Sequence, residues 1–175
     1  GDIPYYFEVY AQPYFVQDIV YTPDYQAKRP NSDAHKWVTF DIARYYLKPD
    51  ESVVVPFTVS VPDGVAPGGH YGVLFAETQP SKGSKAGNSV VRKKRVGSII
   101  YATVTSGSYR NSGEVVDQSS AFFQFNNPLE TNVRIKNTGN TDFIGQSTIE
   151  IAGIFGGVKD VETKDYVVLP DTTRL

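Results

Sequence analysis

Positive charge is concentrated in one short part of the chain. Seven basic residues and no acidic residue lie between Thr78 and Gly113, whereas the rest of the sequence has ten basic and nineteen acidic residues. The formal charge of this segment is therefore +7, and that of the remainder is −9. Ammonium and guanidinium groups at this density attract anions. The predicted anion- or partner-binding site consists of Lys82, Lys85, Arg92, Lys93, Lys94 and Arg95.

Several interpretations of this basic segment compete. The cations could bind an anionic cell-wall polymer, such as a teichoic acid or a phosphorylated glycan, or an acidic partner protein. Nucleic acid is not expected to bind, because the chain as a whole is acidic and no aromatic residues alternate with the cations to stack on bases. The basic residues could also form a solvated hairpin arm that binds nothing.

Tyrosine is abundant at the start of the chain. On a strand that begins at Pro4, Tyr6 and Tyr10 share one face with Glu8, because side chains alternate between the two faces of a strand. Such a polar-tipped aromatic face, extended by Tyr14, could stack on sugar rings or pack on another protein. The alternative is ordinary cross-strand aromatic pairing beneath a neighbouring strand or domain.

Residues suited to catalysis or metal binding are scarce. The chain has no Cys and only two histidines, His35 and His70, and it lacks a G-x-S-x-G nucleophile motif. The phrase NTGNTD lacks the alternating carboxylates of a calcium loop and predicts a turn, with Gly139 or Asn140 in the left-handed conformation. We therefore expect a protein that is not an enzyme, with no catalytic residue, no metal and no cofactor.

The hydrophobic pattern predicts an all-β chain. Runs rich in Val, Ile, Thr, Tyr and Phe are separated by Pro, Gly, Asn and Asp clusters, and no long amphipathic pattern predicts a helix. No apolar run is long enough to span a membrane, so membrane attachment is expected only through a segment outside this chain. The absence of Met favours an internal piece of a longer protein. Strands are predicted at 4–11, 14–21, 36–42, 52–61, 70–78, 96–106, 115–125, 130–136, 144–152 and 166–169.

The clearest alternation is in the sequence SVVVPFTVSV, residues 52–61. One face of this strand carries Val53, Val55, Phe57, Val59 and Val61, and a sheet with one buried face predicts that pattern. A proline in the strand cannot donate a ladder hydrogen bond, which indicates an edge strand or a bulge. The single tryptophan of the chain is expected to anchor the core of the first domain.

Four phrases of the sequence together resemble a known family. They are WVTFDIARYYLKPDESVVVPFTVSVPDGVAPGGHYGVLF, VGSIIYATVTSG, NPLETNVRIKNTGNTDFIGQSTIEIAGIFG and VLPDTTR. In this order they resemble the exported, Ig-like β-sandwich proteins of bacterial cell surfaces that are related to the WxL-interacting proteins. The resemblance covers about residues 37–174. It implies two consecutive sandwich domains, export to the cell surface, no catalytic residues, and binding to peptidoglycan or to partner surface proteins.

The chain also departs from the family at both ends. Family members have further strands before the segment that looks like YYFEVYAQ, and they continue beyond the VLP-x-[ST]-x-R phrase. Each domain of this chain is then expected to have an open sheet edge, which a strand from a neighbouring subunit could complete, giving a homo-oligomer. The alternative is that the ends are simply cut.

These observations predict two tandem Ig-like antiparallel β-sandwich domains with strands missing at the chain ends. The first covers residues 1–108, a linker covers 109–117, and the second, incomplete domain covers 118–175. We expect an extracellular, non-catalytic structural or interaction protein of the bacterial cell surface. It would bind cell-wall polymer or surface proteins through sheet edges and the basic arm. A filament subunit assembled by strand donation and a carbohydrate-binding module with a tyrosine-rich face are the alternatives.

Overall fold

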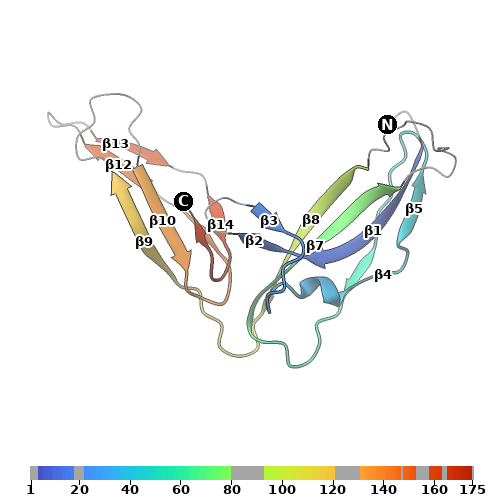
Figure 1. Cartoon of the computed structure of the whole chain (residues 1–175), viewed down its shortest axis with the longest axis horizontal. Coiled ribbons are helices and arrows are strands. Elements are labelled where there is room, and N and C mark those ends of the chain that lie inside the picture. Colours follow the sequence, from blue (N-terminus) through green and yellow to red (C-terminus); the bar gives the residue numbers. More distant parts are fainter. Residues whose placement is uncertain are drawn as a thin grey trace. The chain divides into compact units, whose positions relative to one another are not determined.

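The structure, a computed structural model, describes residues 4–17, 22–79, 93–120, 131–146, 148–152, 158–162 and 165–174. Within these residues the regular elements are antiparallel strands and one short 3-10 helix, η1 (Ala34–Trp37), so the chain is all-β and β-sandwich-like (Figure 1). The chain forms two compact units. The first consists of Gly1–Phe15, Pro23–Ala66 and His70–Ala102, and the second of Val16–Thr22, Pro67–Gly69 and Thr103–Leu175.

The main sheet of the first unit has four strands in the order β5-β1-β7-β8. β1 (Tyr5–Pro13) pairs with β5 (Arg44–Leu47) on one side and with β7 (Gly68–Gln79) on the other, and β8 (Arg95–Val104) follows β7. The other strands of this stretch of sequence form two small pairs, of which β4–β6 is antiparallel. They are β4 (Val38–Phe40) with β6 (Phe57–Val59), and β2 (Phe15–Gln17) with β3 (Thr22–Asp24).

Alternation along β1 builds one hydrophobic core. Phe7 and Val9 point to the same face of the sheet and are buried with Leu47 of β5. Half-buried residues from neighbouring elements pack against this cluster: Phe40, Tyr45, Val55 and Ala76. Trp37 is also buried, with its ring 4.9 Å from that of His70, so the prediction that it lies in the interior is confirmed.

The prediction for residues 52–61 is wrong in extent and in burial. Only Phe57–Val59 form a strand, and Phe57, Val59 and Val61 are 47%, 43% and 51% exposed. Pro56 precedes the strand and has no N–H to donate, and the partner strand β4 is only three residues long, so the ladder cannot extend. Val55 alone of the predicted face packs on the core.

β9 to β15, in the described residues of the second unit, form three small sheets. β10 (Thr131–Asn137) lies between β9 (Gly113–Ser120) and β15 (Thr173–Arg174). The other two sheets are the pairs β11 (Phe143–Gly145) with β14 (Tyr166–Val168), and β12 (Thr148–Ala152) with β13 (Val158–Glu162). β9 begins inside the segment predicted as a linker, 109–117. The ends of two predicted strands, at 18–21 and 121–125, lie outside the described residues.

Two asparagines shape the turn after β10. The fully buried Asn137 amide donates to the carbonyls of Thr141 and Val168, both at 2.8 Å, and its side-chain oxygen accepts from Gly139 N at 2.8 Å. Asn140 donates to carbonyls in two other segments of the second unit. The chain bends here as predicted, but Gly139 and Asn140 do not have a positive φ.

Candidate protein-binding edge

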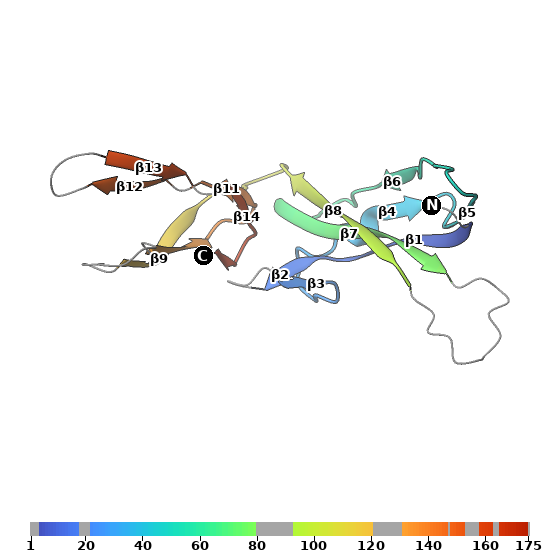
Figure 2. The same ribbon diagram turned by 90° about the horizontal axis from the view of Figure 1, so that it is seen from above.

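β8 is the last strand of the four-stranded sheet. It runs antiparallel to β7 at the sheet edge (Figure 2), and among the described residues no other strand is hydrogen-bonded to it. Its sequence from Val96 to Val104, VGSIIYATV, has the β-branched and aromatic residues typical of strands. It was predicted at 96–106, close to the observed bounds.

The hydrogen bonds at the start of β8 show which backbone groups face β7 and which face away from it. Thr78 N donates to Lys94 O at 2.9 Å, so the backbone of Lys94 faces β7. Because the backbone groups of alternate residues point to opposite edges of a strand, the N–H and C=O groups one position further on face outward. In β8 they include the groups of Arg95, Gly97, Ile99 and Thr103.

Apolar side chains accompany these outward groups. Val96 is 73% exposed, Ile99 40% and Tyr101 39%. Gly97 brings β8 close to β7, since a Cβ at this position would lie 2.7 Å from Phe75 Cε1 and 3.2 Å from Val73 Cγ2. The edge therefore offers outward-facing backbone groups at Gly97 and Ile99 beside apolar surface that a further strand would bury.

The start of β8 is held by a cluster of six residues, here called the Arg95 cluster. The guanidinium carbon of Arg95 lies 4.3 Å from the Phe75 ring centroid and 5.4 Å from that of Tyr25. The Tyr10 hydroxyl donates to Glu77 Oε2 at 2.8 Å, and Lys93 Nζ lies 3.0 Å from Glu77 Oε1. The cluster thus joins β1, β7 and β8, and its members are Tyr10, Tyr25, Phe75, Glu77, Lys93 and Arg95.

Two pKa values respond to this packing. The hydrogen bond from Lys93, followed by that from Tyr10, holds the pKa of Glu77 below its usual value of 4.5. Burial raises the pKa of the Tyr10 hydroxyl above 10.0. The carboxylate of Glu77 and the neutral phenol of Tyr10 are accordingly the forms that the cluster stabilises near neutral pH.

The predicted anion site is only partly represented among the described residues. Lys82, Lys85 and Arg92 lie outside them. Of the other three cations, Lys93 is paired with Glu77 and Arg95 lies over aromatic rings, so both are engaged within the protein. Lys94 is exposed, and its backbone bonds to Thr78. The sequence analysis treated these residues as equivalent positive charges. In the structure, Lys93 and Arg95 have partners within the protein, whereas Lys94 is exposed.

The predicted aromatic face is not a single exposed surface. Tyr6 is 52% exposed and packs on Tyr46, with the ring centroids 4.8 Å apart, while Tyr10 is half-buried in the Arg95 cluster. Tyr14 is buried, at 1% exposure, so its inclusion in a ligand-binding face is wrong. β1 ends at Pro13, and the alternation that relates Tyr6 to Tyr10 does not continue to Tyr14. Cross-strand aromatic pairing, the alternative interpretation, accounts for the Tyr6–Tyr46 contact.

His70 makes a contact that the sequence did not indicate. Its Nδ1 lies 2.7 Å from Asp33 Oδ1, and its Nε2 lies 2.8 Å from the carbonyl oxygen of Ala66. The ring is buried, and both nitrogens face acceptors, so it fastens the loop before η1 to the start of β7. A histidine occupied in this way has no nitrogen available as a general base. Within the described part of the chain, no three His, Asp or Glu side chains gather as metal ligands.

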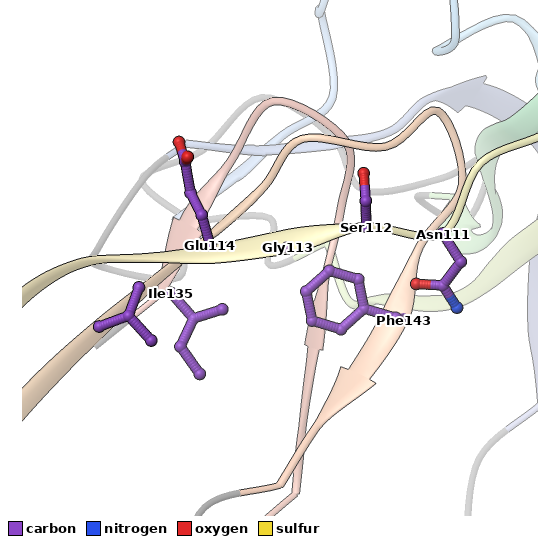
Figure 3. A pocket seen from close by; sticks show the side chains of 7 residues that line it. Asn111, Ser112, Gly113, Glu114, Ile135 and Phe143 are labelled. Atoms are coloured by element: carbon purple, nitrogen blue, oxygen red, sulfur yellow. The ribbon is translucent and has the colours of Figure 1, made fainter.

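A shallow hollow of about 310 Å³ lies beside the start of β9 in the second unit. Figure 3 shows the Phe143 ring on one side of β9, with Ser112 and Glu114 pointing to the other. Phe143 fits closely here because Gly113 has no side chain, and a Cβ would lie 2.8 Å from Phe143 Cζ. The hollow is lined by Asn111, Ser112, Gly113, Glu114, Val115, Ile135 and Phe143.

Comparison with known proteins relates the chain to others by structure alone. No protein-family model and no curated protein sequence matches it. The fold is similar to that of the class 5 fimbriae chaperone CfaA, with a TM-score of 0.54 and 14% identity over 99% of this chain and 72% of that one. A structure described as a chaperone–tip adhesin complex of CFA/I fimbriae biogenesis is similar at a TM-score of 0.55 and 12% identity, with the same coverage. The chain therefore shares its fold with proteins of fimbrial assembly.

No helix among the described residues is long and apolar enough to cross a membrane.

Proposed function

We propose that this protein is a non-catalytic interaction protein that binds an extended segment of a partner protein by strand addition to the outer edge of β8. The observation that carries the proposal is the edge itself, which no other described strand covers, and where Val96 and Ile99 are exposed beside the outward-facing backbone groups of Gly97 and Ile99. A strand added there would form main-chain hydrogen bonds and bury apolar side chains at once.

The composition of β8 supports a functional edge. Proteins usually protect an exposed edge strand with charged residues, proline or bulges, since an unprotected edge pairs with other chains. From Val96 to Val104 the strand has neither a charged residue nor a proline. This stretch without charge or proline therefore favours an edge strand that is available to pair with a partner strand.

The similar structures support the same class of function. One is a fimbrial chaperone and the other is a complex between a chaperone and a tip adhesin, so the shared fold is found in proteins that bind other proteins. A cell-wall polymer is a weaker candidate, because two of the three described cations predicted to bind it have partners within the chain.

The proposal includes an architecture and a location. We take the two compact units as tandem Ig-like sandwiches of an exported protein at the bacterial surface. Support comes from the resemblance of residues 37–174 to the surface proteins related to the WxL-interacting proteins, and from the similarity in fold to fimbrial chaperones.

Proline scanning of the edge tests the proposal. Ile99→Pro removes an N–H that faces outward, so it should leave the β7–β8 ladder intact but block an added strand. Ile99→Thr is the matched control, because it keeps both the N–H and a β-branched side chain. The probe is a library of peptides from exported proteins of the same genome, and the measurement is amide hydrogen exchange with and without peptide.

Binding should slow exchange at the outward amides of Gly97, Ile99 and Thr103, and Ile99→Pro should abolish binding while Ile99→Thr retains it. Peptide binding that protects none of these amides, or that survives Ile99→Pro in a folded protein, would overturn the proposal. Folding of both variants is checked by circular dichroism and thermal denaturation.

A further inference from the structure

We infer that the β8 edge selects a partner strand with carboxylates at its C-terminal end, which lies beside Lys94 when the strand adds antiparallel. This inference rests on the proposed strand addition and specifies the chemistry of the partner. It comes from the distribution of charge along the edge, which is uneven from one end to the other.

The N-terminal end of β8 has more positive than negative charge. Lys93, Lys94 and Arg95 stand together in sequence, and among the described residues Glu77 is the carboxylate that forms an ion pair with this group, through Lys93. Glu77 already bonds Lys93 at 3.0 Å and accepts from Tyr10 at 2.8 Å. Lys94 is exposed at the point where the strand begins, and its ammonium group can reach a carboxylate on an added strand.

The rest of the edge carries no charge that could compete. The sequence has no acidic residue between Glu77 and Glu114, and between Arg95 and Arg110 it has no basic residue either. The next strand inward is β7, and its one acidic residue is Glu77. Glu8 of β1 is separated from β8 by β7 and lies 3.6 Å from Arg44 and 3.4 Å from Gln79. The field along the edge is therefore positive at one end and near neutral at the other.

The uneven charge along the edge favours one orientation of an added strand over the other. Antiparallel pairing is slightly more stable than parallel pairing for each residue, and it places the C-terminal end of the added strand at the start of β8. Carboxylates at that end are attracted to Lys94, whereas lysines there are repelled. The middle of the strand should be uncharged and β-branched on both faces, because Val96 projects to one face of the sheet and Ile99 and Tyr101 to the other.

The gain in affinity from the charge contacts is limited, because Lys94 is exposed to solvent. An ion pair at a solvated rim changes affinity modestly, so two carboxylates beside Lys94 and its neighbours should tighten binding by roughly three- to tenfold. Salt should reduce this gain, because rim charges are screened. The apolar contribution should change little with salt.

The experiment uses three synthetic peptides of about ten residues with one shared core of alternating Val and Thr, which matches the length of the edge. The first has two Asp at its C-terminal end, the second has them at its N-terminal end, and the third has two Lys at its C-terminal end. All three are acetylated and amidated, so that terminal charges do not contribute. Dissociation constants are measured by fluorescence anisotropy at about 0.05 M and about 0.5 M salt.

The expected order of affinity is C-terminal Asp, then N-terminal Asp, then C-terminal Lys, with the differences shrinking at high salt. Lys94→Gln should remove most of the preference, while Lys36→Gln, a matched change at an exposed lysine of η1, should leave it intact. A reversed preference between the two Asp peptides, or an unchanged preference in Lys94→Gln, would overturn the inference.

Two further outcomes separate this inference from the proposed function. Equal binding of all three peptides that is lost in Ile99→Pro would leave strand addition standing and remove the charge selection. If no peptide binds the folded protein, and hydrogen exchange at Gly97 and Ile99 does not change, both the strand addition and the charge selection are ruled out.

Discussion

The guanidinium carbon of Arg95 lies 4.3 Å from the centroid of the Phe75 ring, so the first residue of β8 is fastened to the middle of β7. Phe75 is buried and is also in edge contact with Tyr25, at 5.0 Å between ring centroids. The arginine therefore contributes to the alignment of the edge strand and not only to its charge.

Loss of this contact should cost stability. Arg95→Gln removes the cation from above the rings, and we expect the free energy of unfolding to fall by about 1 kcal/mol. Lys94→Gln is the neighbouring control, with an expected change below about 0.5 kcal/mol for an exposed residue. Urea denaturation measures both, and equal effects of the two changes would show that the position of Arg95 over Phe75 adds nothing.

Truncation of the buried tryptophan should be more severe. Trp37→Ala leaves a cavity where the ring packs against His70, and we expect a loss of about 3–5 kcal/mol. Phe57→Ala, at a half-exposed aromatic residue, should cost about 1 kcal/mol or less. Chemical denaturation measures the free energy of unfolding of both variants. If Trp37→Ala lowers it no more than Phe57→Ala does, the assignment of Trp37 to the core is contradicted.

A methyl group at Gly97 should push β8 away from β7. Its Cβ would lie 2.7 Å from Phe75 Cε1, and Phe75 is itself confined by Tyr10, Tyr25 and Arg95, so it cannot easily move. We expect Gly97→Ala to destabilise the protein by about 1–3 kcal/mol. Ser98→Ala, at the next and exposed position, is the control with little change expected. Hydrogen exchange should also become faster in β8 of Gly97→Ala, and unchanged exchange there would argue against close contact between the strands.

The buried amide of Asn137 should be essential to the second unit. Asn137→Ala removes the hydrogen bonds to the carbonyls of Thr141 and Val168 and the one from Gly139 N, with an expected cost of about 2–4 kcal/mol. Asn132→Ala, an exposed asparagine on the same strand, should cost little. Thermal denaturation distinguishes the two, and similar melting temperatures would mean that water replaces the lost bonds.

Stability at acidic pH should depend on Glu77. Its pKa is lower in the folded state than its usual value of 4.5, so the stabilisation it provides is present above about pH 4.5 and is lost as the pH falls through the folded value. The unfolding midpoint in urea should therefore decrease less between about pH 5 and pH 3 in Glu77→Gln than in the parent protein. Parallel curves for the two proteins would show that the contacts to Lys93 and Tyr10 do not bias this carboxylate.

Local patterns allowed part of the fold to be predicted. The alternation in β1 and β8 and the turn residues before β7 placed these strands within a few residues. β5 was missed because Arg44–Leu47 has no clear alternation, and it forms because β1 pairs with it, as in Tyr6 opposite Tyr46. Residues 52–61 had the best alternation, yet most of that face is exposed, since burial requires a covering layer that a one-dimensional pattern does not contain.

The candidate site was only partly accessible to sequence reasoning. Charge counting correctly drew attention to the start of β8, but it could not separate Arg95, which lies over rings supplied by Tyr25 and Phe75, from the exposed Lys94. An open sheet edge was expected from the family resemblance. Its position depends on which strands are adjacent in space, and that order is set by tertiary pairing.

The single row of outward backbone groups on β8 also limits how many molecules can be bound at one time. Each outward-facing N–H and C=O of β8 can pair with only one added strand, so two competing strands cannot share the same part of the edge. The fraction of β8 edges that hold a given partner strand then depends on the concentrations and affinities of all extended segments present. One of these is the β8 strand of a second copy of this chain. Raising the concentration of the protein would convert binding-competent molecules into self-paired ones, and a titration with partner should show apparent affinity that weakens as total protein increases.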